Sequence, residues 1–251
     1  FCVTFFIGWV HAALYYDIPI DHYTTRVSAL TVATTQISFN HMGTLADAAA
    51  SKPVLIKDTM SSMYPAWIYQ LSVLITSLPL ALTETMTFTL IYYFMQNNYL
   101  GWWEWLLYYM TLTSVNIVMG GFFRLCAMLA PDIPAGSGLG ASMTIYMIVL
   151  SGFFVREDYL ISHAPYFLIF YYYWNPLSYA IRTLSQSEFK SPRYDDLIVN
   201  AYTQAVARKG DVYLYYVNMR EDTMWILWGI MYMFALLVVF VFCQSVVTYG
   251  P

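Results

Sequence analysis

The stretch TMWILWGIMYMFALLVVFVFCQSVV, residues 223–247, carries no charged side chain from end to end. About 20 consecutive apolar residues allow an α-helix to cross the hydrocarbon core of a bilayer, where a non-helical backbone would lack hydrogen-bond partners. The stretch therefore predicts a membrane-spanning helix. It is the least ambiguous segment of this kind in the chain, and it decides the fold class.

The composition of the whole chain points to the bilayer as well. Of the 251 residues, 59% are hydrophobic, 19% are aromatic and only 10% are charged, a balance far from that of a soluble domain. The net charge of -4 and the absence of any run of Lys or Arg exclude nucleic acid as a partner. The chain begins with Phe1 inside an apolar run, which predicts a fragment of a longer protein.

Six segments are predicted to span the membrane. We therefore expect an all-α membrane protein, a six-transmembrane-helix bundle that forms a single domain over residues 1–251. The second segment is rich in Thr and Ser, which favours a helix that faces protein or a wet cavity. The third is overlong, which predicts a tilt or a kink at Pro79. The predicted spans cover residues 1–16, 27–45, 64–95, 106–129, 139–154 and 223–247.

Two connecting segments set the predicted orientation. Residues 46–63 form a polar connector, expected to hold a short helix on the membrane surface, and residues 155–222 form a long loop that carries most of the charge. The aromatic part of this loop, 161–189, is expected to dip into the outer interface as short helices. Basic residues favour the cytoplasmic side, and the connector's side holds Lys52, Lys57 and Arg124 against Arg26 alone. The connector is thus predicted to be cytoplasmic and the loop extracellular.

Several blocks of sequence carry a resemblance to a known family. They are FNHMGTL (39–45), PVLIK (53–57), MYPAWIY (63–69), PLALTE (79–84), GGFFRLCA (120–127), SGFFVRED (151–158) and WNPLSYAIRTLSQSEF (174–189). Their order and spacing resemble the membrane domain of ABCG-type ATP-binding-cassette exporters, in particular the pleiotropic-drug-resistance branch, over nearly the whole chain. Two departures stand out: Thr44 replaces an acidic residue of the family pattern, and Ser187 replaces the Asn of its NEF segment.

The resemblance implies two six-helix halves around a central cavity between the second and fifth spans. Phe153 and Phe154 match the paired bulky residues of an apolar valve above that cavity; two large rings exclude water by dewetting, and interfacial anchoring of aromatics is the alternative. Aromatic side chains bind apolar cargo through area and stacking, although lipid contact is the other explanation for many of them. The positions that correspond to cavity-lining sites are Gln36, Phe39, Ile145 and Ile148.

The resemblance also implies a separate source of energy. No Gly-x-x-x-x-Gly-Lys phosphate loop occurs in the chain, so ATP and Mg²⁺ are expected in a nucleotide-binding domain outside it. The connector matches the element that receives motion from that domain, with Lys52, Pro53, Lys57 and Asp58 as its candidate residues. Whether the second half is part of the same chain or a copy of this one stays open.

Two ionisable residues lie within predicted spans. Glu84 is a functional candidate because a charge inside the membrane is costly. A structural hydrogen bond to another helix is favoured over a role in proton coupling. Arg124 is expected to extend its long stem toward the cytoplasmic boundary. The four histidines are scattered and have no neighbouring Cys pair, so no metal site is predicted.

The sequence therefore predicts the transmembrane half of an ATP-driven exporter of amphipathic or hydrophobic small molecules or lipids, in the plasma membrane. One alternative is the permease of a lipid or glycan exporter with the same six-span plan. A second, from a different class, is an ion channel or an intramembrane enzyme. A channel needs a ring of charged or carbonyl groups, and an enzyme needs convergent ionisable groups at one depth; neither pattern is evident in the sequence.

Overall fold

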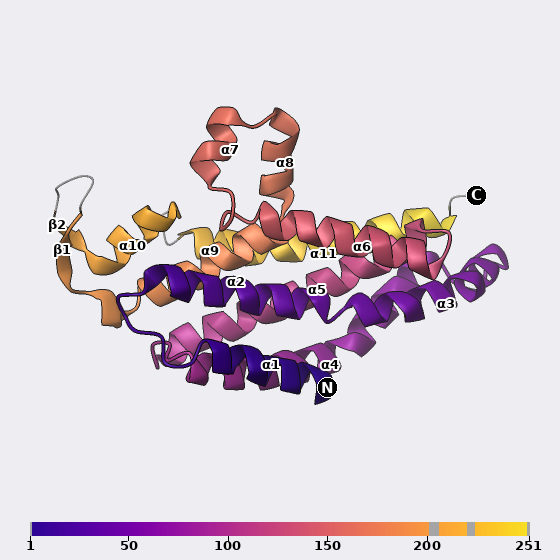
Figure 1. The fold of residues 1–251 in the computed structure, drawn as a ribbon. Helices are drawn as coiled ribbons and strands as arrows, with labels where there is room; N and C mark the ends of the chain where they lie inside the picture. Colours follow the sequence, from indigo (N-terminus) through magenta and orange to yellow (C-terminus); the bar gives the residue numbers. More distant parts are fainter. Residues whose placement is uncertain (1, 201–205, 220–223, 250–251) are drawn as a thin grey trace.

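A computed structural model of the chain describes residues 2–200, 206–219 and 224–249 and is mostly helical (Figure 1). Phe1 and Thr223, where two predicted spans begin, lie outside these residues. The elements are α1 (Cys2–Leu14), α2 (Tyr23–Phe39), α3 (Met42–Met60), α4 (Ala66–Met95), α5 (Trp102–Leu129), α6 (Ile133–Val149), α7 (Glu157–His163), α8 (Tyr166–Trp174), α9 (Pro176–Phe189), η1 (Pro192–Tyr194), β1 (Leu197–Val199), β2 (Val206–Arg208), α10 (Lys209–Val217) and α11 (Met224–Tyr249).

Helix α5 lies at the centre of the bundle. It packs against α2, α3, α4, α6, α9 and α11, and 72% of its most apolar stretch is buried, against 17% for α4 and 28% for α11. A helix that is apolar all round and enclosed by others forms the core, and helices with exposed apolar faces form its cover. In a bilayer, α4 and α11 therefore meet lipid, while α5 meets protein.

Among the residues that the structure describes, three helices are long and apolar enough to cross a membrane: α4, α5 and α11. Shorter apolar helical stretches are Phe5–Leu14 and Ile133–Val149. The chain is thus an α-helical membrane protein, as predicted, and the count of six spans stays a prediction. Pro79 lies inside α4, whose helical assignment nevertheless runs without a break from Ala66 to Met95.

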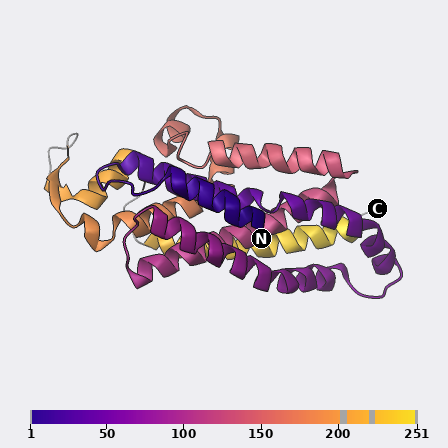
Figure 2. The same cartoon turned by 60° about the horizontal axis from the view of Figure 1, so that its bottom comes forward.

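The predicted second span, 27–45, is not one helix. Helix α2 ends at Phe39, and α3 begins at Met42. The hydroxyls of Thr34 and Ser38 donate hydrogen bonds to backbone carbonyls of the preceding turn. Such bonds slightly destabilise a helix near this point. Helix α3 takes up most of the predicted connector 46–63 and joins α4 through a loop at one end of the bundle (Figure 2).

The predicted fifth span, 139–154, also ends early. Helix α6 ends at Val149. Gly152 then has a φ of +92°, a left-handed backbone conformation that residues with a side chain rarely adopt. The turn sends the chain sideways into α7 and α8, which stand out from the bundle as a hairpin (Figure 1). We call residues 157–174 the lateral hairpin.

Much of the described part of the predicted loop 155–222 is helical. After the lateral hairpin, α9 returns to the bundle and packs against α2, α5 and α11 with its residues buried. Beyond it, β1 and β2 pair antiparallel, with Ile198 opposite Ala207. The strand pair and α10 form a small cap at the end of the molecule opposite α3 (Figure 1). The short helices predicted within 161–189 are α8 and α9, and the prediction missed that α9 packs into the bundle.

Candidate functional site

The four predicted cavity-lining residues lie on α2 and α6, which contact each other. Gln36, Phe39 and Ile148 are half-buried, and Ile145 is 54% exposed. The three cavities described below are lined by other residues. The role of these four side chains in cargo binding stays a prediction.

The two predicted valve residues follow α6 in the non-helical segment before α7. Their rings contact edge to face, with centroids 5.0 Å apart. Phe153 packs against a cluster that includes Phe189 and Tyr213, whereas Phe154 is 63% exposed. The pair lies beyond the end of α6, although the predicted fifth span, 139–154, included both residues. The valve role itself stays a prediction, and of the two rings Phe154 is the one available to a partner.

The predicted coupling residues lie on α3, at the end of the bundle far from the cap (Figure 1). Lys52 Nζ donates a hydrogen bond of 2.9 Å to the carbonyl of Ala130, just after α5. Asp58 accepts 2.9 Å from the hydroxyl of Tyr64. Pro53 and Lys57 are exposed and the intervening Leu55 is buried. Helix α3 is thus fastened to α5 on one side and open to solvent on the other.

Glu84 and Arg124 line a polar cavity of about 400 Å³ between α3, α4 and α5, together with His41 and Asn40. An adjoining cavity of about 240 Å³ shares Thr44, Asp47 and Arg124 with it. The structure thus brings together two residues that the sequence treats separately.

A polar network crosses the bundle beside the larger cavity. The His41 ring nitrogen Nε2 contacts Asn116 Oδ1, and Asn116 Nδ2 donates 2.7 Å to Thr85 Oγ1. The same amide reaches the carbonyl of Ala81 at 3.3 Å. Hydrogen bonds of this kind hold helices together where water is absent. The network joins the α2–α3 junction to α4 and α5.

Two buried ion pairs were not identified from the sequence. In the first, Arg26 Nη1 on α2 lies 2.9 Å from Glu188 Oε1 on α9, and both side chains are buried. Arg26 also donates to Asn98 Oδ1 and to the carbonyl of Ile18, and the Tyr99 N–H donates to Glu188. Burial raises the pKa of Glu188, while the Arg26 guanidinium counteracts part of that effect. We call this set the Arg26 cluster.

The second ion pair fixes the lateral hairpin to the bundle. Arg182 on α9 lies 2.7 Å from Glu157 on α7, and both side chains are buried. The hydroxyl of Tyr173 donates 2.9 Å to the same carboxylate, and Arg182 also contacts the hydroxyl of Tyr172. Burial raises the pKa of Tyr172 to about 12. We call these four residues the Glu157 cluster.

Both clusters left a weak signal in the sequence. Glu157 lies in the SGFFVRED block and Glu188 in the SEF segment, where a carboxylate within an aromatic stretch needs a partner. The partner could not be chosen, because Arg26 is 162 positions from Glu188.

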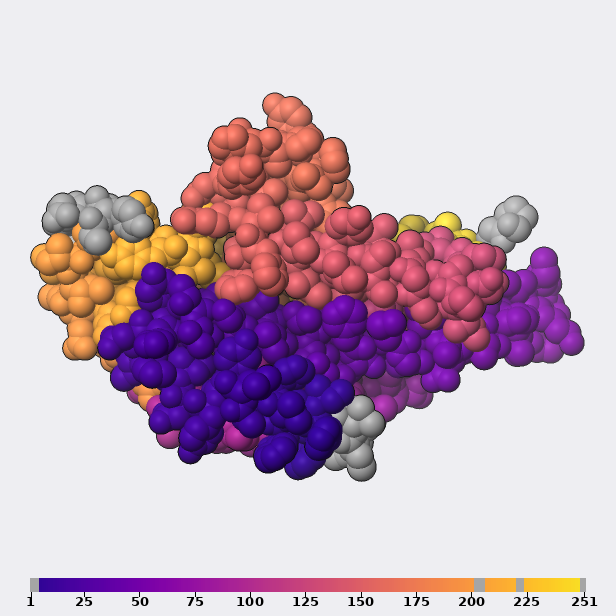
Figure 3. Space-filling view, in the orientation of Figure 1, coloured from indigo at the N-terminus to yellow at the C-terminus, as the bar shows by residue number. Residues whose placement is uncertain are grey.

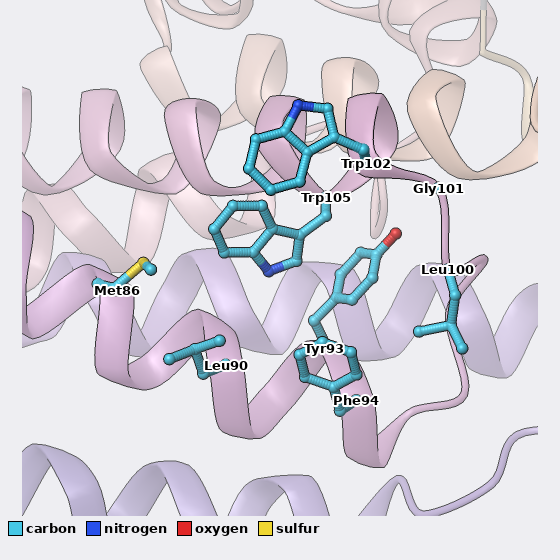
Figure 4. A pocket seen from close by; sticks show the side chains of 8 residues that line it. All are labelled: Met86, Leu90, Tyr93, Phe94, Leu100, Gly101, Trp102 and Trp105. Carbon is cyan, nitrogen blue, oxygen red and sulfur yellow. The ribbon is translucent and has the colours of Figure 1, made fainter.

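The third cavity lies between α4 and α5 near the cap (Figure 4). It has a volume of about 520 Å³ and an almost wholly apolar lining, in which Trp102 and Trp105 face Leu90 and Tyr93. Tryptophan is enriched at the boundaries of membranes. In the described part of the chain, no group of His, Cys, Asp and Glu is arranged to hold a metal ion.

The comparisons with known proteins point to one family. A family model described as "ABC-2 type transporter" matches residues 1–189. Similar proteins include "Pleiotropic drug resistance protein TUR2" of Spirodela polyrhiza, 26% identical over 64% of this chain and 11% of the relative. "Multidrug resistance protein CDR2" of Candida albicans is 22% identical over 75% of this chain and 12% of the relative. "ABC transporter G family member 46" of Oryza sativa subsp. japonica is 24% identical over 76% and 13%.

The matched region therefore spans only 11–13% of the length of these relatives. The resemblance inferred from the seven blocks of sequence is confirmed by these comparisons, since the relatives include both ABC transporter G proteins and pleiotropic-drug-resistance proteins. The match also agrees with the apolar helices of the bundle. This chain belongs to the ABC-2 type transporter family and is a membrane-transport domain.

Proposed function

We infer that this domain is the membrane half of an ATP-driven exporter that moves amphipathic or hydrophobic small molecules outward by alternating access. A nucleotide-binding domain outside the chain supplies ATP and Mg²⁺, and a second six-helix half completes the path. The plasma membrane is the proposed location. Switching between an inward-open and an outward-open state requires an element that can pack in two discrete ways. The bound nucleotide shifts the equilibrium between these two packings.

One observation carries this proposal: α6 lies beside α2 and leaves an apolar face uncovered, and the chain continues from α6 to Phe154. The exposed side chains on this face include Ile145, Tyr146 and Val149, and the surfaces of the two helices adjoin in Figure 3. A cavity for apolar cargo needs such a face from each half. Helix α3 lies at the opposite end, where a nucleotide-binding domain could push on it.

Water accessibility separates this face from an ordinary lipid-facing surface. We expect Ile145→Cys, in the full-length protein with its native cysteines replaced, to react with a membrane-impermeant thiol reagent in the nucleotide-free state. The matched control is Val238→Cys on α11, which is 69% exposed but faces lipid and should stay unlabelled. Transported drug should protect Ile145→Cys, and trapping with ATP and vanadate should change its labelling rate.

Equal labelling at the two positions, in every nucleotide state, would mean that the α2–α6 face meets lipid. The proposal would then lose its cargo path. ATP hydrolysis by the full-length protein is measured in parallel, because an exporter of this kind should hydrolyse ATP faster when the drug is present. A protein that conducts ions without hydrolysis would support the channel alternative instead.

A further inference from the structure

The smaller cavity, of about 240 Å³, is lined by several polar and charged side chains. Helices α3 and α4 both pack against α5, and the cavity opens between them. Its lining combines hydroxyls, one amide and two opposite charges: Thr44, Asp47, Ser51, Tyr69, Gln70 and Arg124, with Ala48, Val73 and Met128 as the apolar remainder.

Two hydrogen-bond donors of this cavity lack partners. Gln70 is 2% exposed, and its Nε2 is buried without a hydrogen bond. The guanidinium of Arg124 forms no hydrogen bond or salt bridge with any residue the structure describes. A buried donor without an acceptor is costly. Gln70 Nε2 is such a donor, and the half-buried Arg124 guanidinium adds a charged donor from a second helix. Together they suit an acceptor with several oxygens, and a phosphate group has that chemistry.

A carboxylate on the same cavity adds a second requirement. Asp47 on α3 is exposed at the cavity's outer side. It would repel a simple anion, but it suits a ligand that carries a cationic group next to its phosphate. Thr44 and Ser51, on the same helix, can accept further hydrogen bonds from an ammonium group. The charges therefore match a zwitterion with the phosphate inward and the ammonium outward.

The position of the cavity selects a lipid as the source. Arg124 lies five residues before the end of α5, about 8 Å along the helix axis, and Gln70 is in the second turn of α4. Both of these helices are long enough to span the membrane, so the cavity lies at headgroup level. Next to it, α4 exposes Trp67 and Leu71, a surface along which acyl chains can pack.

We propose that this cavity binds the headgroup of a phospholipid that joins a phosphate to a primary ammonium, from the leaflet on the α3 side of the bundle. Arg124 and Gln70 donate to the phosphate oxygens, and Asp47 accepts from the ammonium. The lipid bridges α3 to α4, which have no other extensive contact. Occupancy therefore stiffens the junction through which α3 would move.

The test uses the full-length protein, delipidated in detergent and offered defined lipids, with native mass spectrometry to count the bound molecules. We expect phosphatidylethanolamine to be retained over phosphatidylglycerol and over diacylglycerol. Arg124→Gln and Gln70→Leu should each weaken phosphatidylethanolamine binding about tenfold or more, since the first removes the positive charge that faces the phosphate and the second removes an amide donor to it. Arg156→Gln, an exposed arginine near the lateral hairpin, is the matched control and should bind as the wild type does.

Asp47→Asn tests lipid selectivity, which would not change if Asp47 had only a structural role. Loss of the carboxylate should bring phosphatidylglycerol up to the level of phosphatidylethanolamine, because the repulsion of an anion disappears. Gln70→Leu removes a buried amide that has no partner, so its thermal unfolding midpoint in lipid-free detergent should be equal to or above that of the wild type. This variant therefore tests binding without loss of the fold.

Three results would overturn the proposal. The first is unchanged phosphatidylethanolamine binding in both donor variants. The second is equal retention of diacylglycerol, which would reduce the site to apolar contact. The third is equal binding of soluble phosphorylethanolamine, which would assign the cavity to a free metabolite rather than to a lipid.

Discussion

At the scale of single residues, the Arg26 cluster is the contact most sensitive to change. Each partner is buried, so neither Arg26 nor Glu188 can turn to water when the other is lost. Removal of one member of a buried pair leaves an uncompensated charge and costs about 3–5 kcal/mol, whereas removal of both is often tolerated. The cluster connects α2, α9 and the loop after α4 at the cap end of the bundle.

We therefore predict that Arg26→Met destabilises the protein by about 3–5 kcal/mol. The double variant Arg26→Met with Glu188→Leu should recover a large part of this loss. Thermal unfolding of the purified protein in detergent measures both. Asp21→Asn is the control, because Asp21 and Lys209 form an ion pair in which the carboxylate is exposed, and its effect should be small. Equal losses in the single and double variants would contradict this account.

At the scale of helices, close contact between α5 and α6 depends on a residue without a side chain. A Cβ atom placed on Gly140 would lie 2.8 Å from the ring of Phe123, which is buried in α5. Gly138, two residues earlier on the same helix, faces open space. The two glycines therefore have opposite roles in one helix, and their replacement by Ala separates packing from helix propensity.

We expect Gly140→Ala to cost about 1–3 kcal/mol, because the extra methyl forces Phe123 to move. Gly138→Ala should be neutral or stabilising by up to about 1 kcal/mol, since Ala favours the helix. The shift of the thermal unfolding midpoint for each variant decides the matter. Should the two variants behave alike, α6 would have to pack less tightly on α5 than the structure indicates.

Helices could be predicted where length and apolar composition agree. Residues 64–95, 106–129 and 223–247 were predicted as spans, and α4, α5 and α11 occupy them because each has a long apolar run. Helix α9 was expected only as a short helix at the interface, since its polar residues do not indicate burial in the bundle. They are buried by partners that are remote in the sequence, as Arg26 is from Glu188. The sites follow the same rule: Arg124 and Glu84 could be singled out, but not the cavity that they share.

At the scale of the whole molecule, the lateral hairpin changes the outline of the bundle. It projects to one side (Figures 1 and 3) and exposes Tyr166, Phe167 and Phe170. Only its base is fixed, through the Glu157 cluster and the packing of Leu160 and Tyr172. The Glu157 cluster supplies a buried ion pair at this base, and hydrogen bonds join Tyr171 to the carbonyl of Met143 and Tyr232 to the carbonyl of Trp174.

We predict that Arg182→Gln loosens the hairpin without unfolding the bundle. Hydrogen exchange of residues 157–174 should become faster by at least about tenfold, because the Glu157 carboxylate loses a charged partner. Arg156→Gln is the control: its ion pair with Asp158 is exposed at 3.7 Å, so exchange should stay unchanged. If exchange also rises throughout α5 in Arg182→Gln, the cluster stabilises the entire fold and not the hairpin alone.

The central place of α5 has a consequence for biogenesis. The ribosome completes α5 before it makes α9 and α11, two of the helices that enclose it. Until they arrive, one side of the nascent bundle is open, and the amide nitrogen of Gln244 on α11 has yet to reach the carbonyl of Gly121 on α5. Insertion of α11 therefore covers this side of α5, and a nascent bundle without α11 would present that side to the bilayer and to quality-control proteases.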